Sequence, residues 1–124
     1  MDNITKTEKK TEIITIDPQA IDQAQIDRAG DILKRGGLVA FPTETVYGLG
    51  GDATNPGASK AIYAAKGRPS DNPLIVHITN MKDLERIVAE VPQAAYTLAE
   101  HFWPGPLTMI FRKNEKIPYE TTGG

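Results

Sequence analysis

The chain has 124 residues, which predicts a single domain with one hydrophobic core. Its 14 basic and 16 acidic residues give a net charge of −2, so it is not a generically basic nucleic-acid binder, although a local basic patch is compatible with this total. The absence of cysteine excludes disulfide scaffolds, thiol nucleophiles and cysteine zinc sites, and two histidines are too few for a histidine-rich metal site.

The N-terminus carries no recognisable targeting signal. Residues 1–11 are polar, without the apolar segment of a secretory signal, and predict a flexible tail. The longest apolar runs in the chain are far too short to span a bilayer. We therefore expect a cytoplasmic protein without membrane contact, with its domain over residues 12–124.

Apolar periodicity along the rest of the chain predicts alternating strands and helices. Extended segments are expected at residues 13–16, 38–41, 45–52, 73–78 and 107–112. Helices are expected at residues 18–35, 58–65, 81–90 and 92–102. This alternation predicts an α/β domain with a mixed, twisted sheet.

Capping residues mark the ends of these helices. Asp17 is the expected N-cap of the first helix, with Pro18 at its first position, and Gly36 follows its last turn. Asn55 precedes the second helix. Residues 121–124, Thr-Thr-Gly-Gly, are typical of a turn.

The segment Pro42–Gly51 is the first candidate for a ligand site. If it is extended, Thr43, Thr45 and Tyr47 share one face, and their hydroxyls could hold a small polar ligand. The glycines that follow would let the ligand approach the backbone. The alternative is an ordinary strand and turn, because the glycine cluster matches neither a P-loop nor a dinucleotide fingerprint.

The loop Lys66–Pro73 is the second candidate. Arg68 can donate a fork of hydrogen bonds to phosphate oxygens and Lys66 adds a point charge, so the pair suits a polyphosphate. Ser70 and Asn72 add neutral donors. The alternative is that Lys66 merely complements the C-terminal end of a helix.

His77 is the third candidate because it interrupts the apolar segment Leu74–Ile78. A histidine there needs a hydrogen-bond partner or a cavity. It is either a satisfied structural side chain or part of a pocket at a strand end, where α/β proteins commonly bind ligands.

The aromatic segment Phe102–Thr108 is the fourth candidate. Its prolines and glycine favour a rigid corner between a helix and a strand over an aromatic stacking surface. The neighbouring His101 is expected to be exposed and is assigned no role.

Three motifs together resemble the YrdC-like threonylcarbamoyl-AMP synthase family. They are KRGGLVAFPTETVYGLG (residues 34–50), KGRPSDNPLIVHI (residues 66–78) and FWPGPLT (residues 102–108), and the resemblance extends over about residues 12–124. It implies an α/β fold with a YrdC-like twisted, open, mixed sheet, flanking helices and a concave, locally positive surface.

The resemblance also implies a cytoplasmic nucleotidyltransferase. Such a transferase joins L-threonine, bicarbonate and ATP into threonylcarbamoyl-AMP and releases pyrophosphate. Partner proteins then transfer the threonylcarbamoyl group to an adenosine in tRNA, and double-stranded RNA binding would accompany that role. The implied divalent metal is Mg²⁺ carried by the ATP phosphates, and no residue of the chain is assigned as a metal ligand.

Site residues follow from the resemblance position by position. Thr45 and His77 correspond to L-threonine-binding residues. Lys66, Arg68 and Asn72 correspond to ATP-binding residues, and Lys66 and Arg68 are also the expected catalytic residues. The two cations would neutralise charge at the α-phosphate and on the leaving pyrophosphate.

The family pattern continues with a T-V-A-V-R-x-P strand and an S-x-N segment, which this sequence does not contain. We therefore expect the chain to represent the N-terminal portion of the domain. Three alternatives remain: an inactive fragment, a non-catalytic RNA-binding module, and a carbamoyltransferase of the hydrogenase-maturation type. The last is disfavoured because the short N-terminus has no cysteine.

Overall fold

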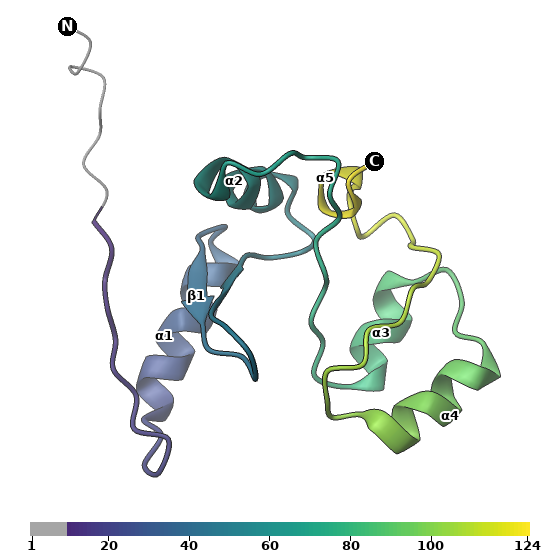
Figure 1. Cartoon of the computed structure of the whole chain (residues 1–124), viewed down its shortest axis with the longest axis horizontal. Helices are drawn as coiled ribbons and strands as arrows, with labels where there is room; N and C mark the ends of the chain where they lie inside the picture. The colour runs from purple at the N-terminus through teal and green to yellow at the C-terminus, as the bar shows by residue number, and fades with distance from the viewer. Residues whose placement is uncertain (1–9) are drawn as a thin grey trace, which may run out of the picture.

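The computed structural model describes residues 10–124, and residues 1–9 of the predicted tail lie outside this range. The helices are α1 (Gln23–Lys34), α2 (Pro56–Lys66), α3 (Met81–Ile87), α4 (Gln93–Phe102) and α5 (Tyr119–Thr122). The strands are β1 (Val39–Phe41) and β2 (Gly48–Gly50). Figure 1 shows α1 and the strands on one side, α3 and α4 on the other, and α2 and α5 at the top.

Helix α1 begins five residues later than the sequence pattern predicts. Its N-cap is Asp22, whose side chain accepts a hydrogen bond from the Ala24 amide at 3.0 Å. Asp17 instead closes a separate turn, where its side chain accepts from the Gln19 amide at 2.9 Å. The predicted N-cap was therefore wrong, because two aspartates offer the same capping chemistry and the second one is used.

Helix α2 follows its predicted caps closely. The Asn55 side chain accepts from the amides of Gly57 and Ala58 at 2.8 and 3.3 Å, and Pro56 occupies the first turn. The helix ends at Gly67, whose φ of +63° is a left-handed conformation that favours glycine. The predicted range of 58–65 was therefore short by two residues at the start and one at the end.

The sheet consists of β1 and β2, paired antiparallel with Phe41 opposite Gly48 and Val39 opposite Gly50. A Cβ atom on Gly50 would lie 2.8 Å from the Phe41 ring, and one on Gly48 would lie 3.2 Å from it. The phenyl ring therefore covers both glycines of β2. Helix α1 contacts β1, the next element along the chain.

Three predicted strands do not form among residues 10–124. The segments 13–16, 73–78 and 107–112 are extended or irregular, and the pairing outside β1 and β2 is an isolated bridge between Val88 and Lys113. A strand needs a continuous partner for its backbone groups, and these segments have only scattered contacts with helix ends. These residues thus contain a two-stranded antiparallel sheet in place of the larger mixed sheet expected from the pattern.

The segments 74–78 and 107–111 nevertheless keep the alternation of a strand. Leu74 and Val76 are half-buried, whereas Ile75 between them is 64% exposed. In the second segment Ile110 is 97% exposed. Each segment therefore has one half-buried face and one exposed face, and the exposed face carries an isoleucine beside His77 in the first segment and between Thr108 and Arg112 in the second.

Helices α3 and α4 carry the buried residues Leu84, Ala95 and Ala99, and a hydrogen bond from Tyr96 to Glu85 joins the two helices. Helix α3 ends earlier than predicted because Val88 turns to an extended conformation and bridges Lys113. The other predicted helix of this pair, at 92–102, is confirmed as α4. No helix among residues 10–124 has the length and apolar character needed to cross a bilayer.

A corner follows α4 as predicted, but it leads into an unpaired segment and not into the expected strand. The Trp103 indole donates a hydrogen bond to the Leu107 carbonyl oxygen at 2.9 Å, and the Trp103–Pro104 peptide bond is cis. Phe102 and His101 are both exposed, as expected for His101.

Helix α5 is absent from the sequence prediction, which assigned residues 121–124 to a turn. It packs against α2 (Figure 1), and its Thr121 side chain is buried there. Gly123 ends the helix with a φ of +79°. Four residues are too few to show a helical period, so the pattern gave no signal for this element.

Candidate functional site

The cationic loop, residues 66–73, leaves the C-terminal end of α2. Gly67 turns the chain, so that Lys66 belongs to the helix and Arg68 to the loop. The Arg68 Nη2 donates to the Pro73 carbonyl oxygen at 3.4 Å, which folds this half-buried side chain across its own loop. Lys66 and Asn72 are exposed. The loop therefore combines an exposed lysine, a half-buried arginine and an exposed amide, which is suitable chemistry for phosphate oxygens.

The Thr43 and Thr45 hydroxyls of the predicted face do come together, with their Oγ1 atoms 3.4 Å apart, but the predicted extended conformation of residues 43–47 is wrong. These residues form a turn, in which the Thr43 hydroxyl accepts from the amides of Thr45 and Val46 at 3.3 and 3.2 Å and donates to the Val46 carbonyl oxygen. Threonine side chains compete in this way with strand pairing. Thr43 is thus used within the turn, whereas Thr45 and Tyr47 are exposed.

His77 lies beside the β-hairpin. Its ring is edge-on to the Phe41 ring, with centroids 5.7 Å apart. Its Nδ1 lies 3.1 Å from the Ile75 carbonyl oxygen, and because a carbonyl only accepts, Nδ1 carries the hydrogen. In neutral histidine this leaves Nε2 as a free acceptor. The Ile75 hydrogen bond and the Phe41 contact fit the satisfied structural histidine of the first alternative, while the exposed side chain leaves a role in a ligand pocket as a prediction.

The predicted residues therefore form two groups. Lys66, Arg68 and Asn72 share the cationic loop, and His77 lies next to the hairpin whose turn carries Thr45. Two concavities are prominent among residues 10–124, and neither is lined by Thr45, His77, Lys66 or Arg68. A single cavity shared by both groups stays a prediction.

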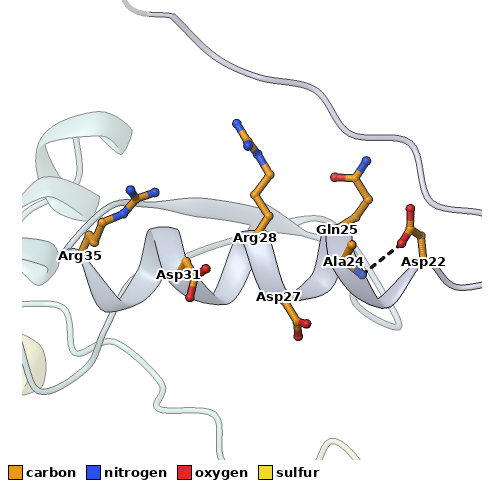
Figure 2. A pocket seen from close by; sticks show the side chains of 7 residues that line it. All are labelled: Asp22, Ala24, Gln25, Asp27, Arg28, Asp31 and Arg35. Atoms are coloured by element: carbon orange, nitrogen blue, oxygen red, sulfur yellow. Dashed lines mark hydrogen bonds between the residues drawn. The ribbon is translucent and has the colours of Figure 1, made fainter.

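The larger concavity, about 650 Å³, runs along α1 and is unrelated to these residues. Figure 2 shows its charged side chains projecting from the helix in different directions, with Arg28 and Asp27 on opposite sides. The hydrogen bond drawn there is the Asp22 cap. These diverging, exposed side chains do not converge on a ligand position.

The smaller concavity, about 390 Å³, lies between α2, α5 and residues Ser70 and Asp71 of the cationic loop. Tyr63, Ser70, Asp71 and Tyr119 are among its lining residues. Sequence reasoning missed Tyr63 and Thr121, which hold the loop from this side. The side-chain partners of Thr121 lie 62 and 68 residues away in the chain, and the Tyr63 hydroxyl bonds to a residue nine positions away, so no local motif signals either residue.

The two side chains with a shifted pKa among residues 10–124, Tyr96 and Arg28, lie outside the cationic loop and the β-hairpin. A hydrogen bond from Tyr96 to Glu85 at 2.6 Å, followed by burial and the carboxylate charge, raises the pKa of Tyr96. The hydrogen bond and charge of Glu12 raise the pKa of Arg28. Residues 10–124 contain no group of three His, Asp or Glu side chains placed to hold a metal ion.

Comparison with known proteins places these features in context. Residues 31–124 match the Sua5_yciO_yrdC family model, described as "Telomere recombination". The chain is 50% identical over 106 residues to a threonylcarbamoyl-AMP synthase of Pyrococcus abyssi, covering 86% of this chain and 31% of the relative. It is 54% identical over 99 residues to a synthase of the same name from Bacillus subtilis, covering 80% of this chain and 27% of the relative.

Solved structures agree with this likeness. A crystal structure of P. abyssi Sua5 complexed with L-threonine matches 84% of this chain at 51% identity with a TM-score of 0.81, and the match covers 31% of that structure. A doubly substituted P. abyssi Sua5 gives a TM-score of 0.82. These structures confirm the predicted family resemblance and the α/β fold class. The chain spans about a third of the length of the P. abyssi relative.

Proposed function

The chain belongs to the Sua5–YciO–YrdC family, and from this membership we propose that it acts in the synthesis of threonylcarbamoyl-AMP from L-threonine, bicarbonate and ATP. The observation that carries the proposal is 50% identity to a protein named threonylcarbamoyl-AMP synthase, over a region that includes both candidate groups. We assign ATP to the cationic loop and L-threonine to the hairpin and His77.

The proposed reaction needs charge neutralisation more than a covalent intermediate. The threonine amine is carboxylated by bicarbonate with loss of water, and a carboxylate oxygen of the product attacks the α-phosphorus of ATP. Pyrophosphate leaves with the electron pair of the broken phosphoanhydride bond. Arg68 and Lys66 would stabilise the negative charge on the phosphates, and Asn72 would donate a further hydrogen bond.

Threonine recognition is assigned to His77 and Thr45. The hydrogen bond of the His77 Nδ1 to Ile75 leaves Nε2 free to accept from the threonine hydroxyl or ammonium group. Thr45 supplies an exposed hydroxyl from the hairpin turn. A site that binds the substrate hydroxyl should reject valine strongly, because valine leaves these polar groups unpaired.

The remaining parts of the proposal concern cofactor and partners. Mg²⁺ would arrive on the ATP phosphates, so it is treated as part of the nucleotide substrate. The product would pass to partner proteins that modify tRNA, which implies a cytoplasmic protein and contact with RNA. Double-stranded RNA binding would follow from that role in tRNA modification.

Titration calorimetry of the 124-residue chain with Mg·ATP and with L-threonine tests the proposal. Arg68→Ala should weaken ATP binding roughly 10- to 150-fold, because one charge-assisted contact is lost. The control Arg35→Ala, at the exposed end of α1, should leave ATP binding unchanged. Equal effects of both substitutions, or turnover of valine equal to that of threonine by an active protein, would contradict the site.

Pyrophosphate release separates the main alternatives. Release that depends on both threonine and bicarbonate supports a synthase. Salt-dependent RNA affinity without such release would favour the RNA-binding module instead.

A further inference from the structure

We propose that α2 and α5 clamp the backbone of the cationic loop and thereby set its geometry for the nucleotide, with Tyr63 and Thr121 as the positioning residues. This inference rests on the proposed function of the loop as the ATP site. Lys66 is exposed and Arg68 is half-buried, whereas the loop backbone at Asn72 is held by the Tyr63 side chain, which is assigned to no ligand.

Tyr63 holds both ends of the loop. Its side chain is 6% exposed, and its hydroxyl donates a hydrogen bond to the Asn72 carbonyl oxygen. Its own carbonyl oxygen accepts from the Arg68 amide at 3.1 Å. One residue of α2 therefore fixes the backbone at both Arg68 and Asn72, the two loop residues assigned to ATP.

Thr121 ties α5 to α2 and to the exit of the loop. It is 1% exposed, and its hydroxyl donates to the Ala53 carbonyl oxygen at 2.7 Å. The Ser59 hydroxyl lies 2.7 Å away and must donate to Thr121, because the single Thr121 hydroxyl hydrogen is already used. The Thr121 carbonyl oxygen accepts from the Leu74 amide at 2.9 Å.

The end of α5 lies directly against the loop. A Cβ atom on Gly123 would lie 2.7 Å from the Asp71 carbonyl oxygen and 3.1 Å from the Pro73 nitrogen. The φ of +79° at Gly123 also favours glycine. The loop is therefore supported at Asp71 and Pro73 by the end of α5 and at Asn72 by Tyr63 of α2.

This support has an energetic consequence for binding. A loop held in its bound geometry loses less conformational entropy when it binds phosphate, so the clamp contributes to affinity without touching the ligand. Its removal should weaken ATP binding and leave threonine binding unaffected. Simple loss of stability would not discriminate between the two ligands.

Tyr63→Phe in the 124-residue chain tests the clamp, because it deletes the hydroxyl and keeps the buried ring. Tyr96→Phe is a matched control, because it deletes a hydroxyl that donates to Glu85 away from the loop. We expect amide exchange at Asn72 and Leu74, followed by NMR, to accelerate in Tyr63→Phe only. The dissociation constant for Mg·ATP should rise roughly 2- to 12-fold, the value of one neutral hydrogen bond, with that for L-threonine unchanged.

Thr121 gives a second test by rescue. Thr121→Val removes the hydroxyl at nearly constant volume and should accelerate exchange at Leu74, whereas Thr121→Ser retains the hydroxyl and should restore protection and ATP affinity. Exchange in Tyr63→Phe equal to that in Tyr96→Phe, or equal loss of ATP and threonine affinity, would overturn the clamp. Faster loop exchange in a chain that never binds ATP would support the clamp and contradict the proposed function.

Discussion

Phe41 connects the glycines of β2 to His77. Its ring covers Gly48 and Gly50 on one side and meets the His77 ring edge-on at 5.7 Å between centroids. The glycines therefore do more than allow a turn, because they leave space for the ring that places His77. Gly-Leu-Gly was predicted from sequence as a region of close ligand approach, and the structure shows an aromatic ring in that space.

Gly50→Ala tests this arrangement. The new Cβ would lie 2.8 Å from the Phe41 ring, so the ring must move, and overpacking of this kind costs about 1–3 kcal/mol in the free energy of unfolding. Threonine affinity should fall more than ATP affinity, because His77 loses its neighbour. Urea unfolding and titration calorimetry measure the two effects.

Gly30→Ala is the matched control. Gly30 lies within α1 with open space around its Cβ position, so alanine there should stabilise the chain by about 1 kcal/mol. Destabilisation by both substitutions alike would refute the steric explanation at Gly50.

Tyr96 provides a pH-dependent prediction. Its pKa is raised, chiefly by the hydrogen bond to Glu85, so the stabilisation is fully present below the ordinary tyrosine pKa near 10 and is lost as pH rises through the folded value. Glu85→Gln should lower the pKa of Tyr96 toward its ordinary value. Absorbance titration of phenolate formation measures it, with Tyr96→Phe identifying the signal, and an unchanged titration in Glu85→Gln would disprove the assignment.

At the scale of elements, capping residues predicted the ends of α2, because a helix end is determined by residues close in sequence. The Asn55 cap, the proline at the start of α2 and the glycine after it mark that helix within two residues at each end. The exit of α4 at Trp103 also follows from its proline and glycine corner. The apolar segments at 73–78 and 107–112 show a period of two but no ladder, because pairing depends on a partner that the pattern cannot identify.

The position of α1 gives a direct comparison between sequence and structure. Asp22→Ala should cost about 1 kcal/mol in the free energy of unfolding, because it removes the N-cap. Asp17→Ala should cost clearly less, because Asp17 closes only an exposed turn. Urea unfolding of both variants decides the matter, and a larger loss in Asp17→Ala would favour the helix start predicted from the sequence.

The candidate site was only partly predictable. The cations at residues 66 and 68 stand out in the sequence, because their charge and the stiff loop between prolines are local features. The turn at Thr43 was missed, because a side chain that bonds to its own backbone resembles a strand residue in the pattern. Thr121 was missed because its partners lie 62 and 68 residues away.

For the whole molecule, the exposed isoleucines Ile75 and Ile110 stand out because both lie on extended segments outside the sheet. Extended segments with unpaired backbone groups and exposed apolar side chains favour association between chains. A net charge of only −2 gives little repulsion against it. We therefore expect residues 1–124 to self-associate as their concentration rises.

Ile110→Ser should reduce this association with little cost in stability, because the side chain is almost fully exposed. Ile13→Ser is the control, since Ile13 is also exposed but lies in the N-terminal segment. Sedimentation velocity over a concentration series measures the effect. A monomeric wild-type chain at all concentrations, or equal effects of the two substitutions, would be incompatible with this expectation.

The contacts of Thr121 also bear on the order of folding. Helices α2 and α4 can form from local interactions, whereas the Thr121 contacts close loops of 62 and 68 residues, which is a slow step in chain collapse. We expect the cationic loop to become protected late, together with α5. In a pulse-labelling refolding experiment, the Leu74 amide should gain protection after the amides within α2. The cationic loop, which would bind the nucleotide, is thus among the last segments to reach its native structure.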